Sequence, residues 1–205
     1  MYWSLSDDNL LTQWPRGRLP EGRGNCIMSA IFRLEGPEED AMMGLEAEIS
    51  RLSRELGEAL LARGWLAATA ESCTGGGVAT AITDTAGSSA WFDRGFVTYT
   101  NEAKQQMLGV SIDSLLRHGA VSEPVVLEMT RGCLARSDAG ICVAISGIAG
   151  PGGGSEEKPV GTVWFAWADR TGRHHSLLAR FDGDRHQVRQ QAVRQALSGL
   201  LALLK

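Results

Sequence analysis

Long apolar runs are missing from the 205-residue sequence. No uninterrupted run approaches the roughly 18 residues that a membrane-spanning helix requires. The first residues carry Asp7 and Asp8 and lack an apolar core, so they do not have the pattern of a secretory signal. The sequence therefore predicts a cytoplasmic protein with no membrane partner.

Closely spaced cysteine pairs are missing too. Cys26, Cys73, Cys133 and Cys142 are widely scattered and form no C-x-x-C motif, which argues against structural zinc and against a disulfide framework. The four histidines are not at H-E-x-x-H or similar metal-binding spacing. We therefore expect buried, reduced thiols, no catalytic metal and no cofactor.

The sequence also has no excess of basic residues. Its formal net charge is −4, which argues against a nucleic-acid partner bound through a broad basic face. A local anion site made by a few arginines stays open. A hydrophobic content of 43% and a charged content of 21% are ordinary for a globular protein. The length suits one domain with a substantial core, or a domain with an appended tail.

The two ends of the sequence differ in pattern. Residues 1–42 contain prolines, glycine clusters and an acidic patch but no long periodic pattern, so we predict a poorly structured extension there. Met28, Met42 and Met43 each lie just ahead of a sensible domain start. A misplaced translation start is therefore one hypothesis for the extension, and residues 43–205 form the predicted domain.

Apolar spacing predicts most of the regular structure. Leu45, Ile49, Leu52, Leu56 and Leu60 recur every three or four residues, which indicates an amphipathic helix closed by a glycine. Further helices are predicted at 78–83, through 104–108, at 123–136 and at 185–204, and strands at 66–71, 95–100, 140–146, 160–168 and 174–181. This order predicts an α/β fold, a three-layer α/β/α sandwich with a mixed, mostly parallel sheet.

The segment ESCTGGG, residues 71–77, lies at a predicted strand-to-helix junction. Its glycines let backbone amides crowd toward a ligand, and such a turn can present the Ser72 hydroxyl beside oxyanion-stabilising amides. No Gly-Lys-Ser/Thr follows, so the segment is not a Walker loop. The alternative is a tight turn in which Ser72 or Thr74 caps the next helix.

The segment TYTNEAK, residues 98–104, runs from a predicted strand into a helix. Tyr99 and Lys104 are candidates to take the proton of a serine nucleophile, which needs a partner base. A lysine serves only where burial or neighbouring positive charge lowers its pKa. The alternative places Lys104 on a solvated helix face and Tyr99 in the core.

Two further segments suggest ligand binding. The segment SGIAGPGGG, residues 146–154, contains five glycines, whose entropic cost is explained by close backbone approach to a ligand or by a mobile lid; a flexible surface loop is the alternative. Asp184 is a predicted helix N-cap. Arg185 and Arg189 share a helix face and are expected to grip a phosphate, unless they form an exposed face paired with acids.

Five motifs in one order, AESCTGG, VTYTNEAK, SGIAGPGGG, KPVGTV and GDRHQVR, resemble the C-terminal domain of the CinA family over roughly residues 45–205. The chain resembles the stand-alone form, without the additional pyrophosphatase-like domain of many members. The resemblance implies a small-molecule substrate, nicotinamide mononucleotide. Its carboxamide would be hydrolysed to nicotinate mononucleotide and ammonia in pyridine-nucleotide recycling.

The resemblance also implies roles for single residues. Ser72 is the expected nucleophile, with Tyr99 and Lys104 in the catalytic group and the choice of base left open between them. Thr100 stands where the family motif usually has serine, which keeps the hydroxyl. Backbone amides of one glycine-rich segment are expected to hold the oxyanion and contact substrate, through Gly75 and Gly76 or through Gly147, Gly150, Gly152 and Gly153.

The remaining substrate contacts are assigned by residue chemistry. Arg185 suits the 5′-phosphate, while Asn101 or Thr74 suits the ribose or the carboxamide. Cys73 competes with Ser72 as nucleophile, since thiols are good amidase nucleophiles. In an extended segment the two side chains point to opposite faces, and the resemblance favours Ser72.

Two other functions stay open on the sequence alone. One is a non-enzymatic nucleotide-binding regulatory module, which needs the glycines and arginines but not Ser72 together with Lys104. The other is an amidohydrolase of a different small amide. A homodimer is expected from the resemblance and from the apolar residues of the first helix.

Overall fold

The computed structural model describes residues 37–205, with side chains from residue 43 onward. Helix α1 spans Pro37–Arg63 and begins eight residues before Leu45, where the apolar pattern begins. The part of the predicted extension at residues 37–42 is therefore helical, which corrects that prediction. A proline followed by three acidic residues is a favourable helix start, because their charge complements the helix dipole. Residues 1–36, with Cys26 and Met28, lie outside the described residues.

The described residues form one five-stranded sheet in the order β2-β1-β3-β4-β5. Strands β1 (Ala67–Glu71), β2 (Phe92–Val97) and β3 (Ile141–Gly147) are parallel, with β1 between the other two. Strands β4 (Thr162–Asp169) and β5 (His174–Arg180) continue as an antiparallel hairpin. The predicted mixed sheet is confirmed, and β4 alone runs against the other strands.

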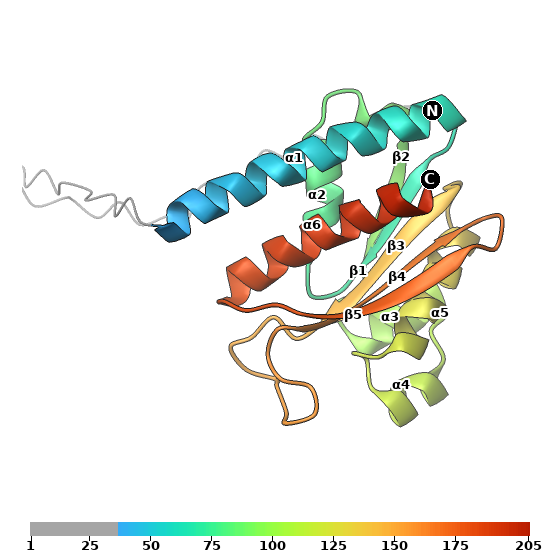
Figure 1. Ribbon diagram of the computed structural model, residues 1–205. Coiled ribbons are helices and arrows are strands. Elements are labelled where there is room, and N and C mark those ends of the chain that lie inside the picture. Colours follow the sequence, from blue (N-terminus) through green and yellow to red (C-terminus); the bar gives the residue numbers. More distant parts are fainter. Residues whose placement is uncertain (1–36) are drawn as a thin grey trace, which may run out of the picture. The chain divides into compact units, whose positions relative to one another are not determined.

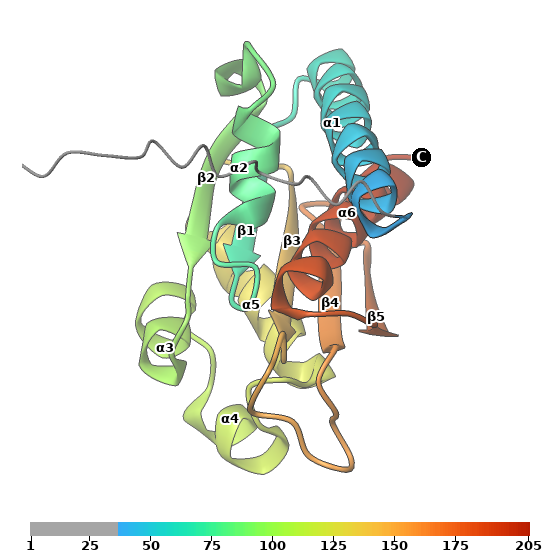
Figure 2. The ribbon, with the colours of Figure 1, turned by 90° about the vertical axis from the view of Figure 1, so that its left-hand side faces the viewer.

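Helices cover both faces of the sheet (Figures 1 and 2). On one face α1 lies beside α6 (Arg185–Leu203), with α2 (Gly77–Thr83) next to them. The opposite face carries α3 (Asn101–Leu108), α4 (Ile112–His118) and α5 (Glu123–Ala135). Each face has its own buried apolar cluster. The predicted three-layer α/β/α sandwich is therefore confirmed.

Burial follows from the position of each strand. Every residue of β1 is buried, and so is every residue of β3 except the last, which is half-buried. Helices cover both faces of these two strands. The edge strands β2 and β5 have only half-buried or exposed residues. Close packing needs a small residue on α6: a Cβ on Gly199 would lie 2.1 Å from the Trp167 indole, whose Nε1 donates to the Ala196 carbonyl at 2.9 Å.

Two further elements differ from the sequence prediction. Strand β2 ends at Val97 and not at Thr100, because Thr100 caps α3, where its hydroxyl accepts from the Ala103 N–H. Helix α4 was not predicted. It exposes Ile112 and Leu116 to solvent, so its sequence lacks the amphipathic pattern on which helix prediction relies.

Candidate active site

The carboxyl ends of β1, β2 and β3 meet at one edge of the sheet, where β1 leads into α2, β2 into α3 and β3 into a long loop (Figure 2). Ser72 directly follows β1, and its N–H still donates to the Ile145 carbonyl of β3 at 3.0 Å. The Thr98 N–H donates to the Glu71 carbonyl at 2.8 Å. These two hydrogen bonds extend the parallel pairing by one residue beyond the strands. They fix the start of the β1–α2 and β2–α3 connections.

Ser72 and Lys104 are in direct contact. The Lys104 Nζ donates to the Ser72 Oγ at 2.9 Å and to the Thr98 carbonyl at 2.7 Å. Lys104 lies in the first turn of α3, whose start is fixed by Thr100. Two segments 32 residues apart in sequence therefore bring a serine hydroxyl and a lysine amine within hydrogen-bond distance.

Lys104 is buried without a counter-ion. Its side chain is 1% exposed, and among the side chains of residues 43–205 no carboxylate lies within ion-pair distance of its Nζ. Burial disfavours the ammonium form and lowers the pKa of Lys104 from 10.5 to about 8. The alternative of a solvated lysine on a helix face is wrong. The neutral amine is accessible near neutral pH, which is what a general base requires.

Cys73 follows Ser72 in the turn after β1. It is 6% exposed and belongs to the apolar cluster under α1 and α6, whereas Ser72 reaches α3 on the opposite face. Both residues nevertheless line the cavity over Ser72, so the prediction that their side chains point to opposite faces stays a prediction. Burial raises the pKa of the Cys73 thiol to about 12, so it stays protonated at neutral pH and is a poor nucleophile. Cys73, Cys133 and Cys142 are buried free thiols, as expected.

Residues 72–77 form a compact connection that we name the serine turn. The Gly75 N–H donates to the Ser72 carbonyl at 3.0 Å, and the Gly77 N–H donates to the Thr74 carbonyl at 3.1 Å. The N-cap of α2 is Gly76, with no side-chain cap, so the alternative in which Ser72 or Thr74 caps the helix is wrong.

Of the predicted oxyanion donors, the Gly75 N–H is thus engaged inside the serine turn, and so is the neighbouring N–H of Gly77. The backbone N–H groups of Cys73, Thr74 and Gly76 meet no backbone carbonyl acceptor among the described residues. Of these three residues only Cys73 lines the cavity over Ser72, so its N–H is the donor that the serine turn leaves available for an oxyanion there.

Tyr99 lies at the rim of the site. It is 57% exposed, so the alternative that places it in the core is wrong. Its hydroxyl accepts a hydrogen bond from Arg185 Nη2 at 2.7 Å, and Arg185 Nη1 donates to the Gly150 carbonyl at 2.8 Å. Arg185 therefore joins the segment after β2, the loop after β3 and the start of α6 above the serine.

A cavity of about 230 Å³ lies over Ser72. Its walls bring together segments after all three parallel strands, as the sequence predicted for the carboxyl edge. A second cavity of about 660 Å³ adjoins it through the shared residues Ala149 and Arg185. Together they give a small chamber at the Ser72–Lys104 pair and a wider space beside α6. Predicted site residues that line the smaller cavity are Ser72, Tyr99, Asn101, Lys104, Gly147 and Arg185.

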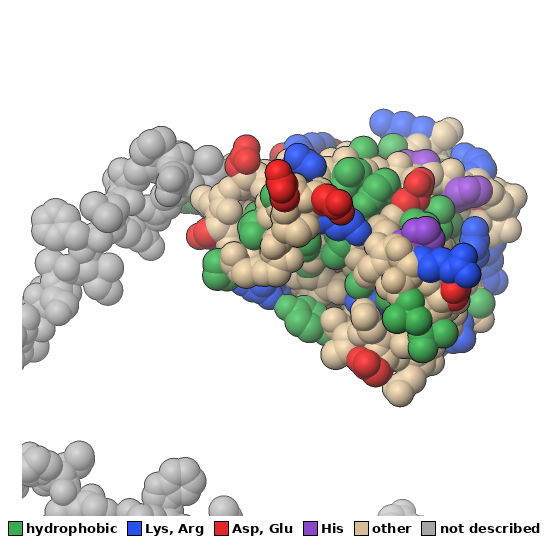
Figure 3. Space-filling view, turned by 90° about the horizontal axis from the view of Figure 1, so that it is seen from below, with side chains coloured by type: hydrophobic (Ala, Val, Ile, Leu, Met, Phe, Trp, Pro, Cys, Tyr) green, Lys and Arg blue, Asp and Glu red, His purple; other side chains and the backbone are tan. Residues whose placement is uncertain are grey.

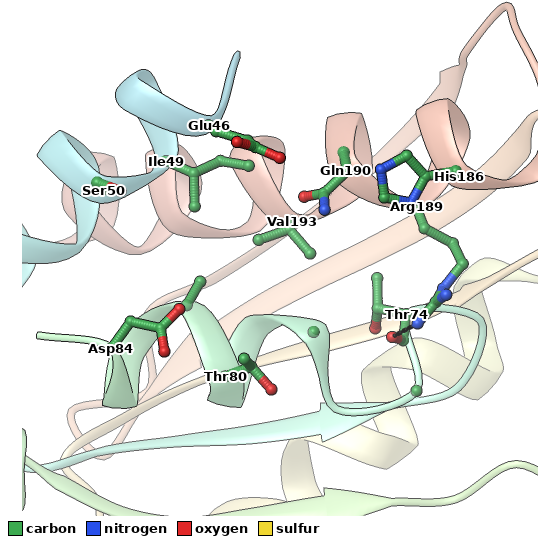
Figure 4. A pocket seen from close by; sticks show the side chains of 13 residues that line it. Glu46, Ile49, Ser50, Thr74, Thr80, Asp84, His186, Arg189, Gln190 and Val193 are labelled. Carbon is green, nitrogen blue, oxygen red and sulfur yellow. Dashed lines mark hydrogen bonds between the residues drawn. The ribbon is translucent and has the colours of Figure 1, made fainter. Parts of the chain in front are cut away.

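Thr74 and Gly75 line a different cavity, of about 440 Å³, between α1, α2 and α6 (Figure 4). In this cavity Arg189 reaches from α6 to the serine turn, and its Nη2 donates to the Thr74 carbonyl at 2.8 Å. Both arginines also line the cavity of about 660 Å³, but their guanidinium groups contact different segments, so a phosphate fork of Arg185 and Arg189 stays a prediction. The alternative of pairing with acids is wrong, since carbonyl and hydroxyl oxygens accept their hydrogen bonds.

The predicted glycine contacts divide in the same way. Gly147 and Gly150 line the two cavities beside Arg185, while Gly152 and Gly153 are exposed and line neither. Gly76 also lines none of the three cavities. We name residues 148–161, which join β3 to β4, the glycine loop. Only its first residues are next to the Ser72–Lys104 pair.

Sequence reasoning missed several residues that shape the site. The Glu71 carboxylate accepts from the Val78 and Ala79 N–H groups at 3.0 and 2.9 Å, and so caps α2. Lys158 Nζ donates to the His118 and Val121 carbonyls and so ties the glycine loop to the segment before α5. Both lie in the quoted motifs, but a contact to a backbone group distant in sequence leaves no signal in a single sequence.

Asp184 caps α6 as predicted: its side chain accepts from the Gln187 N–H at 2.8 Å. Among the described residues, no cluster of three or more His, Cys, Asp or Glu side chains has the geometry of a metal site. No described helix is both long and apolar enough to cross a membrane. Figure 3 views the edge where β1, β2 and β3 end, and acidic, basic and hydrophobic side chains are intermixed there.

A serine hydroxyl in contact with a buried lysine amine, at the carboxyl edge of an α/β/α sandwich, is an arrangement that can serve as a nucleophile with its base. The fold and the site thus define an α/β protein with a buried serine–lysine pair beside a cavity. The chain belongs to the CinA family, because the model of the CinA C-terminal domain matches residues 49–204.

Relatives of known sequence and structure agree with this assignment. The chain is 60% identical to the nicotinamide-nucleotide amidohydrolase PncC of Escherichia coli K12, over 76% of this chain and 94% of that protein. It is 54% identical to the protein of the same name from Pseudomonas putida, over 76% and 96% of the two chains. The crystal structure of a competence/damage inducible protein from Agrobacterium tumefaciens is 49% identical, with a TM-score of 0.76 over 77% of this chain and 96% of that chain.

Proposed function

We propose that this chain hydrolyses the carboxamide of nicotinamide mononucleotide, giving nicotinate mononucleotide and ammonia, with Ser72 as the nucleophile. The observation that carries the proposal is the 2.9 Å contact between Ser72 Oγ and the buried Lys104 Nζ. The names of relatives at 54–60% identity support the substrate. Recycling of pyridine nucleotides is the process that such a reaction serves.

Lys104 is the base that the geometry favours. It touches Ser72, and its lowered pKa of about 8 leaves roughly one amine in ten neutral at pH 7. Tyr99 directs its hydroxyl to Arg185, which suits a role at the rim of the site. We assign the proton transfer to Lys104 and the closure of the cavity to Tyr99 and Arg185.

The reaction has two steps. In the first, Ser72 Oγ bonds to the carboxamide carbon while its proton passes to the neutral Lys104 amine. The tetrahedral intermediate then collapses, the C–N bond breaks, and the nitrogen leaves as ammonia with the proton from Lys104. In the second, water attacks the ester, Lys104 takes a proton from the water, and Ser72 regains its proton as nicotinate mononucleotide leaves.

The oxyanion needs donors close to Ser72. The Cys73 N–H has no backbone acceptor within the described residues, and Cys73 lines the cavity over Ser72, so the serine turn itself supplies a donor in this proposal. The backbone N–H after the nucleophile has this role in other serine enzymes. Loss of one such donor typically raises the barrier by about 3–4 kcal/mol.

The two adjoining cavities suggest how the nucleotide lies. The smaller one, about 230 Å³, takes the carboxamide and the pyridine ring beside Ser72 and Asn101. The larger one, about 660 Å³, takes the ribose and the 5′-phosphate beside Arg185. Arg185 is in contact with a carbonyl and a hydroxyl but with no carboxylate, so its charge is available to a phosphate.

The main test is ammonia release from nicotinamide mononucleotide by the purified protein, with Ser72→Ala and Cys73→Ala as a matched pair. We expect Ser72→Ala to lose at least about a thousandfold in kcat and Cys73→Ala to stay within a few-fold of the parent. A folded parent that binds the nucleotide but releases no ammonia would instead support the non-enzymatic binding module. Activity on other amides alone would change the substrate and keep the chemistry.

Cytoplasmic location remains a prediction from the sequence pattern, and a homodimer remains a prediction from the family resemblance and the first helix. Light scattering on the purified protein measures the second directly, and a monomeric mass at the assay concentration would contradict it.

A further inference from the structure

We infer that Glu71 is a positioning residue: its carboxylate holds the serine turn in the shape that places Ser72 Oγ on Lys104 and leaves the oxyanion donors free. This inference rests on the proposed function and deepens it. Glu71 is fully buried, at 0% exposure, and is the last residue of β1. It touches no predicted substrate position, so it acts through the backbone of the turn.

Both carboxylate oxygens are used for one purpose. Glu71 Oε2 accepts from the Val78 N–H at 3.0 Å, and Oε1 accepts from the Ala79 N–H at 2.9 Å. These are the second and third residues of α2, whose N-cap Gly76 has no side chain to satisfy them. The carboxylate thus closes residues 72–77 from strand to helix, through charge-assisted hydrogen bonds.

The closure has a consequence for the free N–H groups. With Val78 and Ala79 bonded to Glu71, and the N–H groups of Gly75 and Gly77 bonded inside the turn, the first turn of α2 has no donor left for the reaction. Among the residues before α2, the N–H groups of Cys73, Thr74 and Gly76 remain without a backbone acceptor. Glu71 therefore determines where the oxyanion is held as well as how rigidly Ser72 is placed.

The alternation of side chains along β1 explains why a glutamate suits this position. Successive residues point to opposite faces of the sheet, so Glu71 reaches α2 while Ser72 reaches Lys104 on the other face. A buried carboxylate is costly unless it is fully hydrogen-bonded. The Glu71 carboxylate is hydrogen-bonded to the N–H groups of Val78 and Ala79. In this inference, the position of these two groups determines the position of Ser72.

Asp169 offers a matched control at the opposite edge of the sheet. Its buried carboxylate also accepts backbone N–H groups, those of Thr171 and Arg173, in the β4–β5 turn. Asp169 pairs with Ile141, the first residue of β3, whereas Ser72 is bonded to Ile145 near its end. Asp169→Asn therefore measures how much stability and activity are lost when a buried carboxylate that accepts backbone N–H groups is weakened far from Ser72.

The experiment compares Glu71→Gln and Asp169→Asn by kcat, KM, the pH profile and Tm. A glutamine keeps one acceptor oxygen and places an NH₂ group against the second backbone N–H, which disturbs the turn. For Glu71→Gln we expect kcat to fall about a hundredfold, with KM within about twofold and the pH profile unmoved. For Asp169→Asn we expect a lower Tm with kcat retained.

The same variants are treated with phenylmethanesulfonyl fluoride. This reagent measures the reactivity of the Ser72 hydroxyl in the absence of the nucleotide. Ser72 Oγ bonds to sulfur, the S–F bond breaks with loss of fluoride, and the hydroxyl proton passes to Lys104. Intact mass measures the rate, which we expect to be slowed in Glu71→Gln and unchanged in Asp169→Asn. If Glu71→Gln does not fold, Glu71→Asp is measured in the same way, with the same expected direction.

The outcomes separate the two proposals. A parent that reacts with the sulfonyl fluoride but releases no ammonia from the nucleotide refutes the proposed function, and the labelling rates still test Glu71. Retained kcat and labelling in Glu71→Gln would overturn the inference. So would a pH profile that shifts with this variant, because Glu71 would then act on the ionisation of Lys104 and not on the position of the turn.

Discussion

The serine turn and the glycine loop have similar compositions but are held in different ways. The serine turn is fixed from both sides, by Glu71 from β1 and by Arg189 from α6. Residues 151–157 of the glycine loop are exposed, and contacts hold it mainly at its ends, through Arg185 at Gly150 and through Lys158. Glycine content alone therefore does not distinguish the two segments. The buried contacts around each glycine-rich segment do.

One lysine lies at each segment, Lys104 of α3 against the serine turn and Lys158 within the glycine loop, and the two lysines sharpen the comparison. Lys104 is buried and bonded to a reactive hydroxyl, whereas Lys158 is half-buried and bonded to two backbone carbonyls. We expect Lys104→Met to lower kcat by at least about a thousandfold, since it removes the base and keeps most of the side-chain volume. Ammonia release measures this, and a loss below tenfold would contradict the assignment of the base.

The same variant has an expected effect on stability. The pKa of Lys104 is about 8 in the folded protein and 10.5 in the unfolded chain, so below pH 8 the folded state bears the cost of a buried charge. Lys104→Met should therefore raise the free energy of unfolding by about 1–3 kcal/mol at pH 7. The gain should shrink between pH 8 and 10.5, where the wild-type lysine becomes neutral in the folded state first. Urea unfolding of both proteins at pH 7 and pH 10 measures this difference in the free energy of unfolding.

The rate of the parent enzyme should follow the neutral amine of Lys104. With a pKa of about 8, the neutral fraction rises with pH, so kcat/KM should rise by about tenfold per unit below pH 7 and level off above pH 8. A profile that is flat from pH 6 to 9 would argue against a lysine base. Lys158→Met is the control here, and its profile should have the same shape as that of the parent.

Lys158→Met should have a smaller effect on the rate. It removes the contacts of Lys158 Nζ with the His118 and Val121 carbonyls, which lie at 3.0 and 2.9 Å. Because Val121 lines the Ser72 cavity, we expect KM to rise by about two- to fivefold with kcat nearly retained. A large fall in kcat would mean that the glycine loop is as important for the chemistry as the serine turn.

The smallest effect is expected within the glycine loop itself. A Cβ on Gly152 meets no atom within 4 Å, so Gly152→Ala should leave both kcat/KM and Tm unchanged. Gly150 differs, because its φ is +84° and a Cβ would lie 2.6 Å from Val160 Cγ1. Gly150→Ala should therefore lower Tm by several degrees. Equal Tm values for the two variants would contradict this division of the loop.

Much of the fold and part of the site could be predicted from the sequence. The apolar spacing of Leu52, Leu56 and Leu60 predicted the buried face of α1, since burial on a helix has a fixed period. The order of elements predicted the sandwich. The helix start at Pro37 and the whole of α4 were missed, because their signals are local charge and capping and not apolar periodicity.

The site was predicted by residue type more reliably than by role. Ser72, Tyr99 and Lys104 do line one cavity, but Thr74 and Gly75 lie on the other side of the serine turn. A single sequence cannot show which of these residues line the Ser72 cavity, because neighbouring residues in a turn face different helix layers of the sandwich. The position of each depends on which helix packs against which face.

By itself, the sequence determined the alternation of strands and helices, the buried reduced thiols and the residue types available for chemistry, because these depend on local pattern and composition. Only the tertiary structure decided that Lys104 is buried and touches Ser72, and so has a lowered pKa. It also decided that Arg189 contacts the serine turn while Arg185 contacts Tyr99. The physical reason is that burial and hydrogen bonding join segments distant in sequence, and they set the chemistry of each group.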